Sequence, residues 1–238
     1  MQQTHGDPAD SAHSDMDGGQ AKRTPFERVY RGVIRALYEG HYVPGQRLIA
    51  PDLMREFDVG RGTIREVLQR LASTGVVRMI PQKGARVRRL TRREVVDVLD
   101  LVEFLLGLAA RGAARAIADQ TLKEGLQARY EALIGSKSDE DFNGFLAARE
   151  DYYRYLVQLG GNRELQRIFP SIQVHIMRMQ LRMFNRAGDS VDPADYQQLE
   201  EAILSGDPDR AEHAGRIHVQ RTIGRVAQLP DRAFEQGD

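Results

Sequence analysis

Two arginines, Arg61 and Arg65, have the chemistry and the spacing of a surface that reads DNA. A guanidinium group donates hydrogen bonds in a planar fork, which matches the edge of guanine or two oxygens of a phosphate. Residues four apart share one face of an α-helix, so both side chains would reach the same groove. Gly62 and Thr63 leave room for the backbone to approach a duplex, and a helix N-terminus favours a phosphate. The pattern predicts contacts with DNA.

The same arginines also fit an ordinary solvent-exposed helix face, because surface charges are common. In that interpretation Arg65 would pair with Glu66 or Asp58. Without their surroundings, the two arginines leave both interpretations open.

Further residues could extend this surface. Lys83 and Gly84 belong to a turn cluster at residues 81–84, where a glycine permits close approach to the minor groove. An ordinary basic turn is the alternative for these two residues. Arg47 and Arg55 are candidates for phosphate contacts rather than for base contacts.

The charge of the chain is unevenly distributed, although the formal net charge of its 238 residues is zero. Residues 22–93 contain 17 Lys and Arg against 6 Asp and Glu, a net charge of +11, so the remainder carries −11. Such asymmetry suggests that the basic part meets a polyanion.

The elements that would position these residues begin with three helices. Apolar residues recur at helical spacing in segments that start at Pro25, near Pro51 and after Gly60. Gly40 ends the first segment and Gly75 ends the third. The third helix therefore starts with the two arginines.

A two-stranded hairpin is expected next. The run at 76–80 is strand-like, and the run at 85–88 alternates small or apolar residues with basic ones. A short extended piece also follows the turn at 43–48. Three helices followed by a basic hairpin predict a winged helix-turn-helix at 25–90, whose third helix enters the major groove.

The rest of the chain is predicted to be helical. Thr91 and Glu94 form a capping box, and no strand signal of useful length follows. Helices are expected at about 91–118, 121–134, 139–159, 162–186, 193–205 and 207–228. The fold class is thus mainly α, with an all-α antiparallel bundle at 91–230. We expect a disordered tail at 1–24, which is nearly devoid of apolar residues, and a flexible tail at 231–238.

Composition excludes several classes of protein. The chain has no cysteine, which excludes disulfides and thiolate zinc sites. It has no apolar run of about 18 residues and no signal pattern, so we expect a cytoplasmic protein without a membrane segment. It also lacks a nucleophile motif and a phosphate-binding glycine loop, so we do not expect an enzyme.

At this point the sequence resembles the DNA-binding domain of GntR-type bacterial regulators. The matching stretches are residues 44–48 (PGQRL), 59–71 (VGRGTIREVLQRL), 75–77 (GVV) and 83–87 (KGARV). Arg61 and Arg65 match the two arginines with which the family reads DNA. Gly62 and Thr63 replace the usual Thr-Pro, and Pro51 stands where some members carry a DNA-contacting arginine.

The helical remainder resembles the FadR-like branch of that family, whose C-terminal domain is called FCD. The matching stretches are residues 108–114 (LAARGAA), 160–165 (GGNREL) and 201–211 (EAILSGDPDRA). Many members of this branch bind a metal through one Asp and three His. Counting from the matched stretches places these ligands at Arg149, Tyr153, Tyr196 and His218, so that only His218 is retained. Arginine repels a cation and tyrosine is a poor ligand at neutral pH, so we expect no metal cofactor.

The same substitutions suggest a different ligand. The guanidinium of Arg149 could bind an acid directly, and Tyr153, Tyr196 and His218 could supply hydrogen bonds and an aromatic wall. His175 could also face this pocket, or it could be an ordinary core histidine. In the other interpretation Arg149 pairs with Glu150 or Asp151 and the tyrosines merely pack.

The family carries an arginine and a glutamate at two positions that are Val102 and Leu106 in this sequence. The loss of these two polar groups favours a ligand with an apolar end. The effector predicted by this set is a small organic acid.

The resemblance implies a homodimer that binds double-stranded DNA at a palindromic operator. We expect a transcriptional regulator, a repressor, whose operator affinity is controlled by the acid. The alternatives are the same regulator with a divalent metal in its effector pocket, and an architectural DNA-binding protein with no effector.

Overall fold

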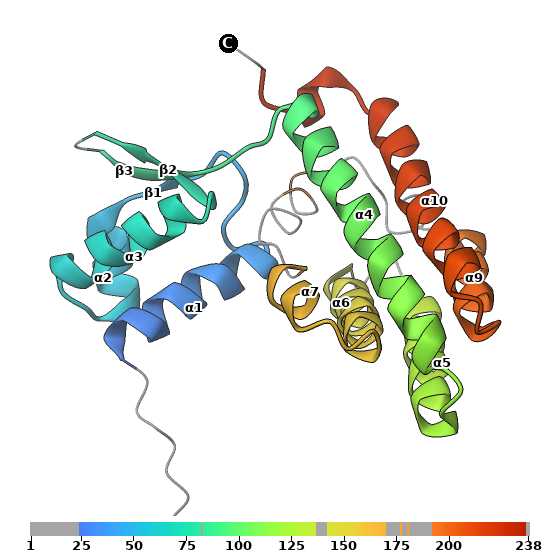
Figure 1. The fold of residues 1–238 in the computed structure, drawn as a ribbon. Coiled ribbons are helices and arrows are strands. Elements are labelled where there is room, and N and C mark those ends of the chain that lie inside the picture. Colours follow the sequence, from blue (N-terminus) through green and yellow to red (C-terminus); the bar gives the residue numbers. More distant parts are fainter. Residues whose placement is uncertain are drawn as a thin grey trace, which may run out of the picture.

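The computed structural model describes residues 24–81, 83–136, 142–169, 177, 180 and 192–236. Figure 1 shows a small part with helices and a sheet beside a larger helical part. The predicted fold class is confirmed: the chain is mainly helical with a small N-terminal sheet. The predicted disordered tail, except for Thr24, and His175 lie outside the described residues.

The smaller part contains the three expected helices: α1 (Pro25–Tyr38), α2 (Ala50–Phe57) and α3 (Arg61–Ser73). A capping box formed by Thr24 and Glu27 starts α1, with Pro25 in its first turn. Fully buried apolar side chains join α1 to α3 and fix the direction of α3; they are Val29, Val33, Ile64, Val67 and Leu71.

The sheet has one strand more than the predicted hairpin. Strands β2 (Val77–Ile80) and β3 (Gly84–Val87) form that hairpin, and β1 (Arg47–Leu48) pairs antiparallel with β3 to give the order β1-β3-β2. The extended piece expected before α2 is therefore the third strand, and it ties the wing to the helices.

Gly84 is required by the backbone at the start of β3. Its φ is +88°, in the region that favours glycine, and an added Cβ would lie 2.5 Å from the carbonyl oxygen of Leu48. Gly84 therefore has a structural role in the wing, whether or not it approaches a ligand.

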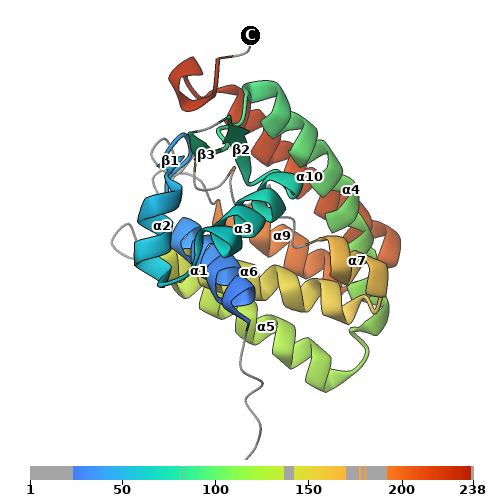
Figure 2. The ribbon, with the colours of Figure 1, turned by 90° about the vertical axis from the view of Figure 1, so that its left-hand side faces the viewer.

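The larger part is built from six described α-helices. They are α4 (Arg92–Ala116), α5 (Gln120–Gly135), α6 (Phe142–Leu159), α7 (Arg163–Ile168), α9 (Pro193–Leu204) and α10 (Pro208–Ala227). Thr91 and Glu94 form the predicted capping box at the start of α4. Figures 1 and 2 both show α4 and α10 side by side. The two helices approach closely where Gly215 lies next to Gly107, because neither residue has a side chain. A Cβ added to Gly215 would lie only 3.1 Å from the Cα of Gly107.

The end of the chain differs from the flexible tail predicted at 231–238. Residues 229–236, which we call the C-terminal segment, include a 3₁₀ turn at Asp231–Ala233, and the side chain of Phe234 is only 3% exposed. The backbone N–H of Glu235 donates to the carbonyl of Leu90 (2.9 Å), in the linker that enters α4. The described part of the tail is therefore packed against the rest of the chain, with the aromatic ring of Phe234 buried.

Two side chains hold the C-terminal segment against the linker. The amide of Gln180, which is buried, donates to the carbonyls of Leu90 (2.7 Å) and Ala233 (2.9 Å) and accepts from the N–H of Leu90 (2.6 Å). Arg92 donates to the carbonyl of Leu229 (2.7 Å) and lies 4.3 Å from the ring centre of Phe234. The linker between the two parts is thus fixed by the last residues of the chain.

None of the described helices is long and apolar enough to cross a membrane.

Candidate functional site

The N-terminus of α3 presents the two predicted arginines to solvent. Arg61 is its first residue and Arg65 lies one turn later, and both are exposed. No carboxylate of the described residues forms an ion pair with either, so the alternative pairs with Glu66 and Asp58 are absent. An added Cβ on Gly62 would meet no atom within 4 Å, which leaves open space beside the backbone. No acidic residue occupies this first turn, so its positive end is not neutralised.

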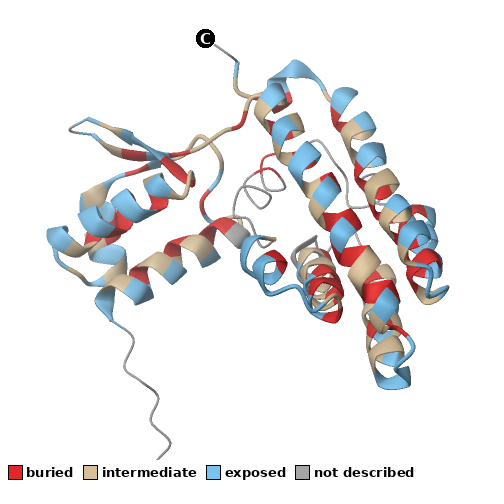
Figure 3. Cartoon of the chain, viewed as in Figure 1, coloured by how far each residue is buried: buried red, intermediate tan, exposed pale blue. Residues whose placement is uncertain are grey.

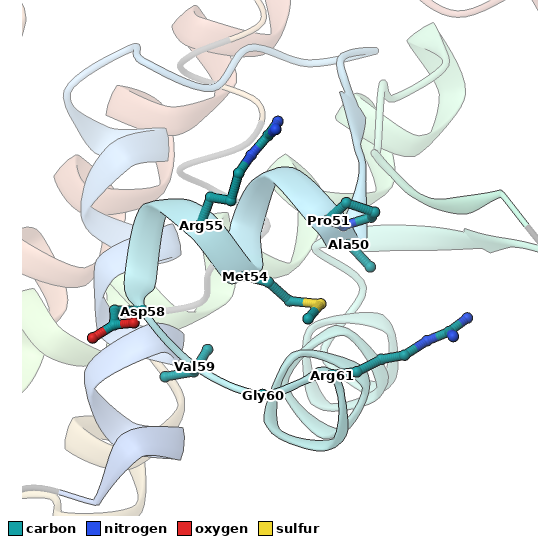
Figure 4. A pocket seen from close by; sticks show the side chains of 8 residues that line it. All are labelled: Ala50, Pro51, Met54, Arg55, Asp58, Val59, Gly60 and Arg61. Atoms are coloured by element: carbon teal, nitrogen blue, oxygen red, sulfur yellow. The ribbon is translucent and has the colours of Figure 1, made fainter.

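A surface hollow of about 830 Å³ adjoins this end of α3 and runs along α2 (Figure 4). Its lining residues are Ala50, Pro51, Met54, Arg55, Asp58, Val59, Gly60 and Arg61. In Figure 4, Met54 points from α2 toward the start of α3, while Arg61 extends out from the helix. Arg55 is paired with Asp52 one turn away, so it is a weaker anion ligand than Arg61.

The wing carries a row of arginines that sequence reasoning identified only in part. The strand register places Arg47 opposite Arg86 and Arg86 opposite Arg78, so the three side chains share one face of the sheet. All three are exposed. Like charges directly opposite one another are destabilising, so this face favours a polyanion. The alternation at residues 85–88 was the signal for Arg86, whereas Arg78 is the single basic residue of its strand and had no such signal.

Arg47 also helps to hold the tip of the wing, because its Nε donates to the carbonyl of Lys83 (3.0 Å). Lys83 itself is exposed and Gly84 is half-buried. The predicted DNA-contacting residues therefore lie on α2, on the start of α3 and on the sheet.

A second cluster joins three helices of the larger part. Arg149 and Tyr153 come from α6, Tyr196 from α9 and His218 from α10. The hydroxyl of Tyr153 lies 2.7 Å from Nε2 of His218 and 3.1 Å from the hydroxyl of Tyr196. The guanidinium of Arg149 lies 5.5 Å from the ring centre of Tyr153. The structure thus brings together four of the five residues predicted for the effector pocket, which we call the Arg149 cluster.

His218 is neutral in this cluster. Burial, and then the charge of Arg149, lower the pKa of His218 to about 4. Its Nδ1 lies 3.4 Å from the carbonyl of Asp195, which can only accept a hydrogen bond, so Nδ1 carries the proton and Nε2 accepts from Tyr153. Tyr196 can then donate to the oxygen of Tyr153, which orders the three groups into one chain of hydrogen bonds.

Arg149 keeps an unused donor within this cluster. Its Nε is shielded from solvent and has no hydrogen-bond partner. The alternative pair with Asp151 is absent, because Asp151 pairs with Arg129 (3.0 Å) and Arg154 (3.6 Å). Within the part of the chain that the structure describes, no carboxylate pairs with Arg149. A charged group with a buried free donor suits an anionic ligand.

The cluster does not fit the metal that many FCD domains bind. A divalent cation needs several neutral imidazoles or carboxylates together, whereas here a guanidinium and two phenols surround one histidine. Nε2 of that histidine is already engaged by Tyr153. The described residues contain no group of three His, Asp or Glu side chains that could hold a metal.

A buried carboxyl next to this cluster was not found by sequence reasoning. Glu200 lies one turn after Tyr196 on α9, is 4% exposed, and has an Oε2 atom without a hydrogen-bond partner. Burial, and then the charge of Glu131, raise the pKa of Glu200 to about 8. The buried hydroxyl of Tyr152 also lacks a partner.

Replacement of Glu200 with glutamine is expected to stabilise the protein at alkaline pH. The folded chain holds the Glu200 proton up to about pH 8, whereas the unfolded chain releases it near pH 4.5. Stability is therefore lost as the pH rises through this window, and E200Q should gain on the order of 4 kcal/mol over the wild type at its upper end. Urea unfolding followed by circular dichroism at pH 5 and pH 8 measures the difference.

The matched control is E201Q, because Glu201 is the exposed neighbour of Glu200 on the same helix. His218 contributes a slope of opposite sign below pH 6.5, but it is common to all three proteins and cancels in the comparison. Equal pH dependence in E200Q and the wild type would show that Glu200 is ionised in the folded state.

Family models match both parts of the chain. The family model for bacterial regulatory proteins of the gntR family matches residues 25–87, and the FCD domain model matches residues 97–221. A probable D-xylose utilization operon transcriptional repressor of Paenarthrobacter nicotinovorans is 25% identical over 217 residues, which cover 91% of this chain and 92% of the relative. The transcriptional repressor GlaR of Escherichia coli K12 is 25% identical, covering 84% of this chain and 94% of GlaR.

Solved structures show the same fold. McbR/YncC of E. coli superposes with a TM-score of 0.67 at 20% identity, covering 87% of this chain and 98% of that one. A GntR-type regulator from Rhodococcus sp. RHA1 gives a TM-score of 0.71 at 18% identity, covering 85% and 97%.

Proposed function

Because the chain belongs to the GntR family of bacterial regulators and carries an FCD domain, we propose that it is a dimeric repressor whose operator affinity is controlled by a small organic acid. Its family and relatives are transcriptional regulators rather than enzymes. In this proposal residues 25–90 bind DNA, residues 91–230 bind the effector and the second subunit, and the protein acts in the cytoplasm.

For the DNA-binding half of the proposal, the main support is the pair of exposed arginines at the start of α3, with which no carboxylate of the described residues forms an ion pair. Arg61 and Arg65 would read base edges in the major groove, with Gly62 and Thr63 next to the backbone of the duplex. Lys83 and Gly84 would approach the minor groove. Arg47 and Arg55, together with Arg78 and Arg86, would bind phosphates. Two copies related by a two-fold axis would read a palindromic operator.

For the effector, the observation that carries the proposal is the buried, unpartnered Nε of Arg149 beside Tyr153, Tyr196 and His218. A carboxylate placed there would accept from this guanidinium, and the aromatic rings would contact the body of the acid. The positions of Val102, which is half-buried, and Leu106, which is 1% exposed, are apolar. An acid with an apolar or aromatic body suits this set better than a highly polar one.

The connection between the two sites would run along α10. This helix carries His218, and the carbonyls of Val226 and Ala227 at its C-terminal end each accept from Arg92 in α4 (3.1 Å). A shift of α10 on ligand binding would therefore reach the linker. Coupling between such sites is typically about 1–3 kcal/mol, enough to change operator affinity about 5- to 150-fold.

A panel of organic acids tests the effector proposal by calorimetry on protein treated with a chelator. We expect at least one aromatic or aliphatic acid to bind without added metal, and R149A to weaken its binding by about tenfold or more, because a charge-assisted contact is lost. R149K keeps the charge without the planar fork and should give intermediate affinity.

The matched control is R154A, which removes an exposed arginine of the same helix. Unchanged acid binding in R149A, or binding that needs a divalent cation, would contradict the proposal; the second outcome would support the metal alternative.

A further inference from the structure

Two buried polar groups next to the Arg149 cluster lack hydrogen-bond partners. They are the hydroxyl of Tyr152 in α6 and Oε2 of Glu200 in α9, and both atoms are shielded from solvent. The residue Tyr152 is 0% exposed and Glu200 is 4% exposed. Figure 3 shows how such buried residues recur along the helices of the larger part. A buried polar group without a partner costs stability, so each of these two groups calls for an explanation.

The two groups lie in the same part of the bundle. After burial, the charge of Glu200 is the largest cause of the raised pKa of Tyr152, although no hydrogen bond joins the two side chains. Burial also raises the pKa of Glu200 itself to about 8. At neutral pH its carboxyl group therefore offers an O–H donor as well as an acceptor oxygen. One small group with a donor and an acceptor would satisfy both residues.

This pair adjoins the residues proposed to bind the effector. The ring centre of Tyr152 lies 5.5 Å from that of Tyr153 and 6.1 Å from that of Tyr196. Arg149 lies three residues before Tyr152, so the two share one face of α6. Glu200 follows Tyr196 by one turn of α9, about 6 Å along the helix axis. The guanidinium and the two unpartnered groups are therefore about one helical turn apart, next to the same tyrosine rings.

We propose that Tyr152 and Glu200 form a second recognition point of the effector site, and that the effector is an aromatic acid with a hydroxyl group opposite its carboxylate. The carboxylate binds Arg149 and the aromatic body lies against the tyrosine rings. The hydroxyl of the ligand accepts a hydrogen bond from Tyr152 and donates one to the carboxyl group of Glu200. The inference rests on the proposed acid effector and specifies its far end.

A neutral hydroxyl suits this end of the site better than a second carboxylate. Tyr152 and the protonated Glu200 are both uncharged at neutral pH, and a buried charge without an opposite partner is costly. The charge of Glu131 also contributes to the raised pKa of Glu200, so negative charge is already close by. A dicarboxylate would add to it, whereas a phenol-like hydroxyl does not.

The protein without ligand provides the first test. Removal of a buried hydroxyl that has no partner should increase stability, so Y152F should melt about 2–4 °C above the wild type. The matched control is Y155F in the same helix, because the hydroxyl of Tyr155 donates to the carbonyl of Leu122 (3.2 Å) and its loss should lower the melting temperature. A lower melting temperature in Y152F would show that this hydroxyl is already satisfied in the folded protein, and would overturn the proposal.

Matched pairs of acids provide the second test, by calorimetry on protein treated with a chelator. The pairs are para-hydroxybenzoate with benzoate, and para-hydroxyphenylacetate with phenylacetate. In at least one pair the hydroxylated acid should bind about tenfold more tightly, because it gains two hydrogen bonds. Y152F and E200L should lose this preference but still bind the acid without the hydroxyl. E200Q should keep the preference, since an amide also donates and accepts.

The variant R149A separates this inference from the proposed acid effector, because it should weaken the binding of both members of a pair alike. Equal affinities for the two members in the wild type, with binding weakened in R149A, would overturn the hydroxyl site and leave the acid effector standing. A preference that persists in both Y152F and E200L would also overturn it, since other residues would then bind the hydroxyl. Failure of all four acids to bind would exclude this class of ligand, while the wider panel of acids decides whether any acid is the effector.

Discussion

Alanine at both Arg61 and Arg65 is expected to abolish the preference of this protein for its operator over random DNA. Each well-placed arginine contact discriminates between bases by about 1–3 kcal/mol, so the loss of both should lower the specificity ratio about a hundredfold or more. Affinity for random duplex should fall much less, because phosphate contacts supply most of it. Mobility shifts at fixed salt, with an operator selected by the wild-type protein and a scrambled duplex, measure the ratio.

Two variants serve as controls for this result. R70A removes an exposed arginine of α3 that lies nine residues after Arg61, about half a turn around the helix, and it should leave the specificity ratio unchanged. R86A removes the central arginine of the wing row and should weaken both duplexes alike, with a salt dependence reduced by about one unit. An unchanged specificity ratio in the R61A/R65A variant would show that α3 does not read the bases of the operator.

Replacement of Phe234 with alanine is expected to destabilise the helical part by about 3–5 kcal/mol. This ring is 3% exposed, so its removal leaves a cavity in addition to the lost burial of apolar surface. The change also removes the ring on which Arg92 lies. Chemical unfolding followed by circular dichroism measures the loss.

D231A is the matched control, because Asp231 belongs to the same segment and pairs with Arg92 but is 87% exposed. Its removal should cost at most about 1 kcal/mol, the usual range for an exposed ion pair. A loss in F234A no larger than that in D231A would mean that the C-terminal segment does not contribute to the stability of the folded chain.

The DNA-binding part was largely predictable because its signals are local. Apolar spacing and the glycines at residues 40, 60 and 75 mark its three helices, and alternation marks its hairpin. Strand β1 was predicted only as an extended piece, because two residues carry no alternation and their pairing depends on β3. The row formed by Arg47, Arg78 and Arg86 depends on the same register, so it appears only when the strands are aligned.

In the helical part, family landmarks predicted which residues would lie close together. Counting from them identified Arg149, Tyr153, Tyr196 and His218, which lie on three helices and meet only in the folded chain. The burial of Glu200 had no such landmark, because a glutamate on an amphipathic helix is ordinarily exposed. The packing of Phe234 was missed for a similar reason, since Arg92 and Gln180, which hold the C-terminal segment, lie far away in sequence.

The C-terminal segment also bears on the synthesis of the protein. The linker at Leu90 is held by Gln180, Ala233 and Glu235, residues that emerge from the ribosome well after the DNA-binding part has been made. Domains fold in the order of their synthesis, so the part with Arg61 and Arg65 can acquire its structure first. A chain terminated before residue 229 would keep the hydrogen bonds between Gln180 and Leu90 but lose the contacts of Ala233 and Glu235 that complete the anchor of the linker. Incomplete translation would thus yield a folded DNA-binding part whose linker is held less firmly.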